Sequence, residues 1–319
     1  MTRNVFVVLS PRSLPYAAIG LRTLMKNSAD PLRLTLLTDS EDDRKVLEDH
    51  VTQLPCERGS SVAVFGKKAA DERAAAQFSE FAYLRGFREG HPCWRKITDP
   101  LLFAEKGEEV VILDPDLIFP NRFRFEPTPA KGVLLMWQKP NCLLPSEVVL
   151  KGMDLGVRFA HHVDIGVGQL RAGFDLDWLD WVIGRLGGAG LPRIMHVEAI
   201  VWSALLMHLG GGHLDPRAWH CWARTQYKRT MLKLGWPRTS ILKMDNLADV
   251  KCFHAGGEAK WWLEDKGLEE WRAPGKSLLL DTPVRAVAEL EKSSLENELR
   301  LKRLISALGY YRYFDRRPA

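Results

Sequence analysis

VVILDPDLIFP, residues 110–120, joins an uninterrupted apolar run to two aspartates that flank a proline. Such a run is typical of a strand buried on both faces, as in a parallel sheet. In an extended chain, residues i and i+2 point to the same side, so Asp114 and Asp116 are expected to face one point. Pro115 offers no N–H to a neighbouring strand and therefore suits the end of a sheet. The stretch predicts a buried strand that ends in a pair of carboxylates.

Around this stretch, the chain alternates between strand-like and helix-like segments. Apolar runs at 5–10, 33–39, 61–65 and 109–114 alternate with helical patterns at 16–27, 41–51 and 69–89. Further strands are expected at 131–137, 161–173 and 250–257, and helices ended by glycines at 174–188 and 198–211. Continuous apolar strands separated by helices indicate a sheet covered on both faces. The prediction is an α/β fold with a mostly parallel central sheet flanked by helices.

The composition changes at about residue 274, which divides the chain into a main domain, 1–273, and a C-terminal part, 274–319. The latter contains an amphipathic helical pattern at 283–308 and a tail, 309–319, in which basic and aromatic residues alternate. Such a tail suits the anionic surface of a membrane. A helix that packs on its own domain or forms a homodimer explains the pattern equally well.

The overall composition is that of an ordinary globular protein. The 319 residues are 46% hydrophobic and carry a formal net charge of +5, which is modest, and no recognised motif supports nucleic-acid binding. Five scattered cysteines without a C-x-x-C pair argue against a disulfide framework. No stretch approaches the roughly 20 apolar residues of a membrane span. We therefore expect a cytoplasmic protein, either free or peripheral on the inner face of a membrane.

The paired carboxylates at the end of the 109–114 strand admit two interpretations. Ligands of open parallel sheets bind beyond the carboxyl ends of the strands. Two carboxylates placed there repel each other unless a positive charge lies between them, and oxygen-rich sites suit Mg²⁺ or Mn²⁺. The functional interpretation is a divalent cation that holds a diphosphate. The structural alternative is that Asp114 and Asp116 only turn the chain and are solvated.

A second polar segment, FHAGGEAKWW from Phe253 to Trp262, supplies partners for such a site. The imidazole of His254 could complete the coordination of a cation and favours Mn²⁺ over Mg²⁺. Gly257 lets the backbone approach a phosphate, and Lys260 could neutralise charge on a diphosphate. A buried core histidine and a solvated lysine are the alternative.

These two motifs resemble those of the retaining GT-A glycosyltransferases that include glycogenin and the lipopolysaccharide galactosyltransferases. That family has a strand ending in L-D-x-D and a later H-x-x-G-x-x-K-P-W, in which Trp261 replaces the proline here. The resemblance covers about 5–262. Looser matches are Ser10 and Tyr16 near the start, Lys96 before the L-D-x-D strand, Asp164-Ile165-Gly166 for a family N-S-G, and Glu198-Ala199 for a family D-Q.

The resemblance implies a UDP-sugar donor with Mn²⁺ or Mg²⁺ as cofactor. The implied cation ligands are Asp114, which would also contact the ribose, Asp116 and His254. Gly257 and Lys260 would hold the diphosphate. Ser10, Tyr16 and Asp39 would lie near the base and ribose, and Lys96 near the ribose or the donor sugar. Asp164 and Glu198, which depart from the family pattern, are the catalytic candidates that would grip sugar hydroxyls; ordinary surface or capping acids are the alternative.

The function that follows from the resemblance is transfer of a hexose from a nucleotide-sugar to a glycan, protein or lipid-linked acceptor. The family expectation is retention, with the departing phosphate taking the acceptor's proton. A non-catalytic protein of the same fold that binds a nucleotide or a partner is the rival hypothesis. A nucleotidylyltransferase is disfavoured because the segment after the first strand, SPRSLPYAA, has no glycine before Gly20.

Overall fold

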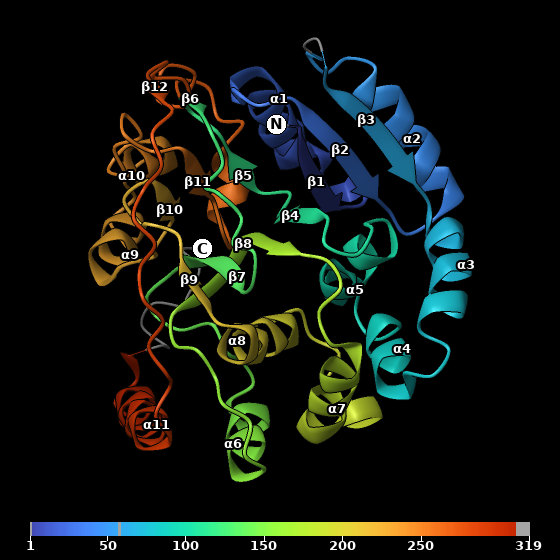
Figure 1. Ribbon diagram of the computed structural model, residues 1–319. Helices are drawn as coiled ribbons and strands as arrows, with labels where there is room; N and C mark the ends of the chain where they lie inside the picture. The colour runs from blue at the N-terminus through green and yellow to red at the C-terminus, as the bar shows by residue number, and fades with distance from the viewer. Residues whose placement is uncertain (1, 57–58, 311–319) are drawn as a thin grey trace.

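The computed structural model describes residues 2–56 and 59–310. Its centre is a seven-stranded sheet with the order β3-β2-β1-β4-β8-β7-β9 (Figure 1). The four strands of the first half are parallel: β1 (Arg3–Val8), β2 (Leu32–Leu37), β3 (Ser61–Phe65) and β4 (Glu109–Leu113). β8 (Val163–Arg171) runs antiparallel to both β4 and β7 (Val133–Trp137), and β9 (Gly211–His213) is parallel to β7. The predicted α/β class and mostly parallel sheet are confirmed.

Helices cover both faces of this sheet because its strands are apolar on both sides. Along β4, Val111 and Leu113 belong to one hydrophobic core, and Val110 and Ile112 to the other. The first core receives α1 (Leu14–Asn27) and α2 (Glu41–Val51). The second receives α3 (Lys67–Gln77), α4 (Ala82–Arg88), α5 (Arg95–Leu102), α6 (Ser146–Asp154), α7 (Leu176–Leu186) and α8 (Val197–Leu209).

A small second sheet, with the order β10-β11-β5, positions the site. β5 (Leu117–Ile118) directly follows the two aspartates and pairs antiparallel with β11 (Cys252–His254), which is parallel to β10 (Trp219–Cys221). In this register His254 lies opposite Leu117, next to Asp116. The remaining elements are α9 (Gln226–Lys233), α10 (Arg238–Leu242), a two-stranded pair formed by β6 (Arg122–Phe123) and β12 (Ser277–Leu278), and the 3₁₀ turns Pro11–Ser13, Pro92–Trp94, Gly188–Gly190 and Ala259–Trp262.

Two predicted helices differ from the observed ones. The segment 69–89 is broken into α3 and α4, which are separated by the buried Phe78. The helix predicted over 283–308 begins only at Lys292, as α11 (Lys292–Ala307). Its first part is extended instead because Arg285 exchanges backbone hydrogen bonds of 2.8 and 2.9 Å with His213. Tertiary pairing with a strand edge therefore overrides the helical pattern.

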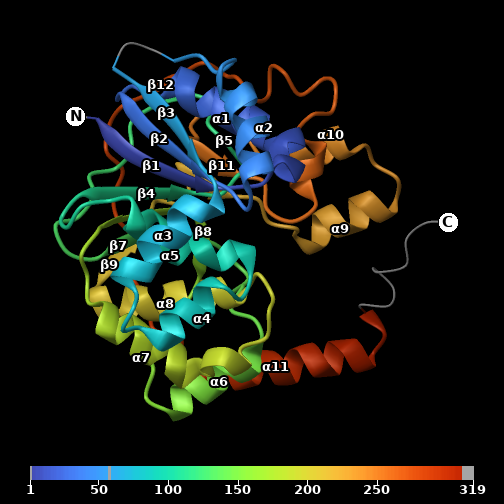
Figure 2. The ribbon, with the colours of Figure 1, turned by 90° about the vertical axis from the view of Figure 1, so that its right-hand side faces the viewer.

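α11 lies beside α6, away from the second sheet (Figure 2). Leu295 is its buried contact, whereas Leu301 and Leu304 are exposed. The basic-aromatic tail from residue 311 onward lies outside the described residues, so its proposed membrane contact stays a prediction. Within the described part of the chain, none of the helices has the length and apolar character needed to span a bilayer.

Candidate active site

A cleft of about 180 Å³ opens where β1 and β4 end. It is lined by residues from the first strand end, the first helix, the start of α5, the Asp-Pro-Asp segment and the loop after β11. The lining residues are Val8, Leu9, Ser10, Ser13, Tyr16, Asp39, Pro92, Cys93, Lys96, Asp114, Pro115, Asp116, Met195 and Lys260. Six of the sequence-predicted site residues thus share this cleft with Asp116: Ser10, Tyr16, Asp39, Lys96, Asp114 and Lys260.

The two predicted motifs meet beside the cleft although they are separated by about 140 residues of chain. Nε2 of His254 lies 3.3 Å from an oxygen of Asp116 and 3.8 Å from an oxygen of Asp114. The backbone fixes this arrangement, because the amide of Ala255 donates to the carbonyl of Asp116 at 3.0 Å. The amide of Asp114 donates to the carbonyl of Gly166 at 2.9 Å. Both aspartates are therefore held by strand pairing on either side.

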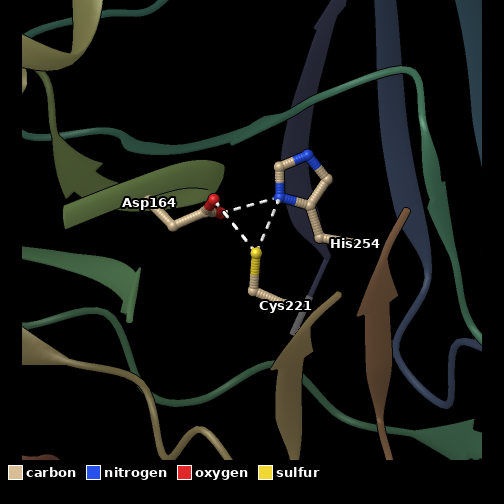
Figure 3. Close-up of side chains that lie close together, drawn as sticks. All are labelled: Asp164, Cys221 and His254. Atoms are coloured by element: carbon tan, nitrogen blue, oxygen red, sulfur yellow. Dashed lines mark hydrogen bonds and ion pairs between the residues drawn. The ribbon is translucent and has the colours of Figure 1, made fainter. Parts of the chain in front are cut away.

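The other imidazole nitrogen of His254 faces Asp164, which projects from β8 (Figure 3). Nδ1 lies 2.8 Å from Oδ1 of Asp164, and the same oxygen accepts from the amide of Gly166 at 2.9 Å. A side chain at Gly166 would collide with the ring, because its Cβ would lie 2.7 Å from Nδ1. Oδ2 of Asp164 accepts from the thiol of Cys221 at 3.3 Å. Asp164, predicted to grip a sugar hydroxyl, is thus placed so that both its oxygens have protein partners.

Burial and neighbouring charges have opposing effects on the pKa values of the site residues. Burial lowers the pKa of His254, but Asp164 and Asp116 outweigh it and hold the pKa well above its ordinary value. For Asp116, burial raises the pKa, yet the imidazole and Lys260 bring it to about 2. For Asp114, burial together with the neighbouring carboxylate raises the pKa despite the opposing effect of Lys96. Crowded carboxylates of this kind favour a bound cation.

Lys96, from the first turn of α5, connects the cleft to Glu198 on α8. Its Nζ lies 2.5 Å from Oδ1 of Asp114 and 3.0 Å from Oε2 of Glu198, the latter outside hydrogen-bonding geometry. Trp202 donates from Nε1 to the other carboxylate oxygen of Glu198 at 3.2 Å. Burial raises the pKa of Glu198 to about 8, although Lys96 opposes this. The second catalytic candidate therefore contacts Lys96 beneath the cleft and is not itself among the lining residues.

The remaining predicted residues occupy two sides of the cleft. Tyr16 donates to Oγ of Ser13 at 3.0 Å, and Asp39 forms an ion pair with Arg95. Lys260 has its Nζ 3.5 Å from Asp116 and 5.1 Å from the centre of the Tyr16 ring.

Gly257 adopts φ of +68°, as a left-handed turn requires. It follows β11 but does not line the cleft.

Some lining or supporting residues were not identified from the sequence. Arg95 directly precedes Lys96 in WRK, and its charge could have indicated a partner for Asp39. Cys93 and Met195 reach the cleft from a 3₁₀ turn and from the loop before α8. No local pattern marks either residue, because only the tertiary fold brings them to this place.

The donor set formed by Asp114, Asp116 and His254 fits a divalent cation. One ligand atom of each lies within 4.8 Å of the others. The imidazole presents Nε2 to the aspartates, while its Nδ1 is fixed by Asp164. A carboxylate that orients the imidazole in this way is a common second partner of histidine ligands. Two carboxylates with one imidazole suit Mn²⁺ better than Mg²⁺, which prefers oxygen ligands alone.

Comparison with solved structures identifies the architecture. Mouse xyloside xylosyltransferase 1 superposes with a TM-score of 0.54 and 10% sequence identity, over 81% of this chain and 99% of that one. The chain has a GT-A glycosyltransferase fold. GlyE of Streptococcus pneumoniae TIGR4, a glycosyltransferase, gives a TM-score of 0.49 at 10% identity over 95% and 64% of the two chains. An active-site mutant of LgtC gives 0.48 at 14% identity over 84% and 93%.

Sequence comparison adds nothing to this likeness. No protein-family model matches the chain. None of the curated proteins matches it either. At identities this low the structural likeness establishes the fold, and the chemistry of the cleft has to carry the function.

Proposed function

We propose that this protein is a metal-dependent glycosyltransferase that transfers a sugar from a UDP-sugar to an acceptor with retention. The observation that carries the proposal is the meeting of Asp114, Asp116 and Nε2 of His254 at one edge of the cleft, with Lys260 beside them. A cation-binding donor set next to a fixed ammonium group is what a diphosphate leaving group requires.

Asp114, Asp116 and His254 would hold Mn²⁺, or Mg²⁺ with lower preference. When bound, the cation supplies positive charge that stabilises the departing diphosphate. Lys260, whose Nζ already lies 3.5 Å from Asp116, adds a second positive charge at the same side. Ser10, Tyr16 and Asp39 also line the cleft, and the nucleoside would bind against them.

Two lysines offset the negative charge of the aspartates. Lys96 pairs with Asp114, and Lys260 approaches Asp116. Fixed charges that need no rearrangement at the moment of reaction are the main source of electrostatic catalysis. Lys96 lines the cleft beside Asp114, so it would face the ribose or the donor sugar of a bound donor.

Asp164 and Glu198 would act through their neighbours. Asp164 holds the imidazole of His254 and would orient a cation ligand, whereas Glu198 contacts Lys96 and would position a residue that faces the donor. No strong general base is required in a same-face displacement, because the departing phosphate can accept the proton of the acceptor hydroxyl.

A thermal-shift experiment with UDP and Mn²⁺ tests the binding half of the proposal. At a ligand concentration about 100-fold above the dissociation constant, stabilisation is about 2.7 kcal/mol, which raises the melting temperature by several degrees. Asp116→Ala should lose this shift. Asp42→Ala, at an exposed acid on α2, is the matched control and should keep it. An equal shift in the Asp116 variant and the parent would refute the assignment.

Release of UDP from a panel of UDP-sugars separates an enzyme from a non-catalytic binder of the same fold. An enzyme should hydrolyse at least one donor slowly in the presence of Mn²⁺, and Asp116→Ala should abolish the reaction. Binding of UDP with no turnover of any donor would favour the rival hypothesis.

A further inference from the structure

The side chains of Asp164, Cys221 and His254 come from three different strands and meet at one place (Figure 3). Asp164 comes from β8, Cys221 from β10 and His254 from β11. Sγ of Cys221 lies 3.3 Å from Oδ2 of Asp164 and 3.8 Å from Nδ1 of His254, and Nδ1 lies 2.8 Å from Oδ1 of Asp164. Carboxylate, thiol and imidazole thus share one small space on the side of the ring opposite to Asp116.

These spacings match those of ligands around a tetrahedral metal. With bonds of about 2.3 Å to sulfur and about 2.0 Å to nitrogen or oxygen, ligand atoms at tetrahedral angles are roughly 3.3–3.6 Å apart. The observed separations of 2.8–3.8 Å need only small side-chain adjustments. Oε1 of Gln138 lies 3.5 Å from Sγ of Cys221 and, with water, is a candidate for the fourth position.

We propose that Asp164, Cys221 and Nδ1 of His254 form a second cation site, selective for a thiophilic divalent ion such as Zn²⁺ or Cd²⁺. We further propose that occupation of this site excludes the cation from Asp114 and Asp116.

The selectivity follows from the ligand atoms. A thiolate suits Zn²⁺ and Cd²⁺, whereas Mn²⁺ and Mg²⁺ prefer the oxygens of the neighbouring aspartates. Binding sends the protons on Sγ of Cys221 and on Nδ1 of His254 to solvent. The ion then carries two positive charges against one thiolate and one carboxylate. A neutral cluster of this kind can be buried without an uncompensated charge.

The exclusion follows from the chemistry of a single imidazole. A neutral imidazole has one ring nitrogen with a free lone pair, and the other carries a proton. When Nδ1 of His254 binds a metal, Nε2 carries the proton and faces Asp116, 3.3 Å away, as a donor. When Nε2 binds the cation, Nδ1 carries the proton and donates to Asp164. The protein would therefore be inhibited by a thiophilic ion through loss of one ligand, without any blockage of the cleft.

Gly166 brings the backbone of β8 close to the triad without a side chain. Gly166 lies directly against the ring, and any side chain there would fill the space beside Nδ1 and Asp164, with a Cβ 2.7 and 3.0 Å from them. Its amide also fixes Asp164 by a 2.9 Å hydrogen bond, as an outer partner of a metal ligand commonly does.

A cadmium titration tests the site without relying on enzymatic activity. The purified full chain is titrated with Cd²⁺, and the ultraviolet charge-transfer band of the cadmium–thiolate bond is recorded. The parent should bind one ion with high affinity. Cys221→Ser should lose the band and weaken binding by about 10- to 100-fold. Cys56→Ser, at an exposed cysteine remote from the triad, is the matched control and should behave as the parent. A band of parental strength and affinity in Cys221→Ser would overturn the site.

Competition with Mn²⁺ tests the exclusion, which rests on the proposed function. Free Mn²⁺ is followed by electron paramagnetic resonance with and without saturating Cd²⁺. Cadmium should weaken Mn²⁺ binding strongly in the parent and in Cys56→Ser, and much less in Cys221→Ser. Without cadmium, Cys221→Ser should bind Mn²⁺ as the parent does, which checks that the variant is folded. By reciprocity, Mn²⁺ should weaken Cd²⁺ binding by the same factor.

The possible results separate the two proposals. A thiolate band that depends on Cys221 but is insensitive to Mn²⁺ supports the second site and overturns the exclusion. If sugar transfer is detected, Zn²⁺ should inhibit it, excess Mn²⁺ should relieve the inhibition, and Cys221→Ser should be less sensitive. If no donor is turned over, the proposed enzyme activity fails while the cadmium result still stands.

Discussion

Replacing Glu198 by glutamine should make the stability of this protein less dependent on pH. The Glu198 side chain is only 1% exposed, and burial raises the pKa of its carboxyl to about 8 against the opposing effect of Lys96. The unfolded chain, with the ordinary pKa of 4.5, loses this proton much earlier. Between these values the native state binds more protons than the unfolded state, so the free energy of unfolding falls as the pH rises.

The magnitude follows from the two pKa values. The interval from 4.5 to about 8 corresponds to about 5 kcal/mol at about 1.4 kcal/mol per pKa unit. Glutamine keeps the shape of Glu198 and can still accept the hydrogen bond of Trp202, but it cannot ionise. The free energy of unfolding of the variant minus that of the parent should therefore increase by up to about 5 kcal/mol over this pH range. The corresponding change in melting temperature is about 2–4 °C per kcal/mol.

Urea unfolding of both proteins at several values from about pH 5 to about pH 9, with a chelator present, measures this difference. Asp42→Asn is the control, because this acid on α2 is fully exposed and contacts none of the buried titratable groups of the cleft. Its difference from the parent should not change with pH. A difference for Glu198→Gln that is equally flat would show that Glu198 stays ionised as a partner of Lys96, and would refute the reasoning.

Three further substitutions test separate features. Lys260→Ala should weaken binding of UDP by about tenfold or more, because a hydrogen bond to a charged group contributes about 1.5–3 kcal/mol. Binding of uridine, which lacks the diphosphate, should change little. An equal loss of affinity for both ligands in calorimetry would contradict a diphosphate contact. Asp164→Asn should weaken Mn²⁺ binding about 10- to 100-fold by releasing the imidazole it orients, and unchanged affinity would show that this contact is irrelevant. Gly20→Ala should lower the melting temperature, because its Cβ would lie 2.3 Å from the carbonyl oxygen of Leu117 and must displace backbone, at roughly 1–3 kcal/mol. Gly86→Ala on α4 is the control, since no atom lies within 4 Å of the added Cβ.

The sequence predicted the sheet well because its central strands contain apolar runs, such as Val110 to Leu113 of β4, that are buried on both faces. This pattern depends only on local composition and burial; it is weaker in β2, which contains Arg33 and Thr35, and in the partly exposed edge strand β3. The prediction of helix for residues 283–291 was wrong because a contact with a distant strand decides their structure. These residues have a helical pattern, but Arg285 completes the backbone hydrogen bonds of β9. The sequence of the segment alone cannot predict that it will pair with a free strand edge formed by another part of the chain.

The site was predictable to the extent that its residues lie in short motifs. Asp114 and Asp116 follow β4, and Lys260 lies in the turn shortly after His254, the last residue of β11, so two local patterns located four residues of the candidate site. The partners that fix these residues come from other elements. Cys221 is one example, because only the parallel pairing of β10 with β11 brings it to the imidazole.

The buried charges explain why the site needs those unpredicted partners. From Glu198 to Asp164, acidic and basic side chains alternate: Glu198 contacts Lys96, Lys96 contacts Asp114, and His254 lies between the two aspartates and Asp164. A buried carboxylate without a neighbouring positive charge would instead be protonated or destabilise the fold. A divalent cation bound to Asp114 would displace Lys96 at one end of this series, and a thiophilic ion bound to Cys221 would release the protons of the thiol and of Nδ1 of His254 at the other. Because both events act on the same row of charges, binding at either end should alter the affinity at the other, and the imidazole is the residue through which they compete.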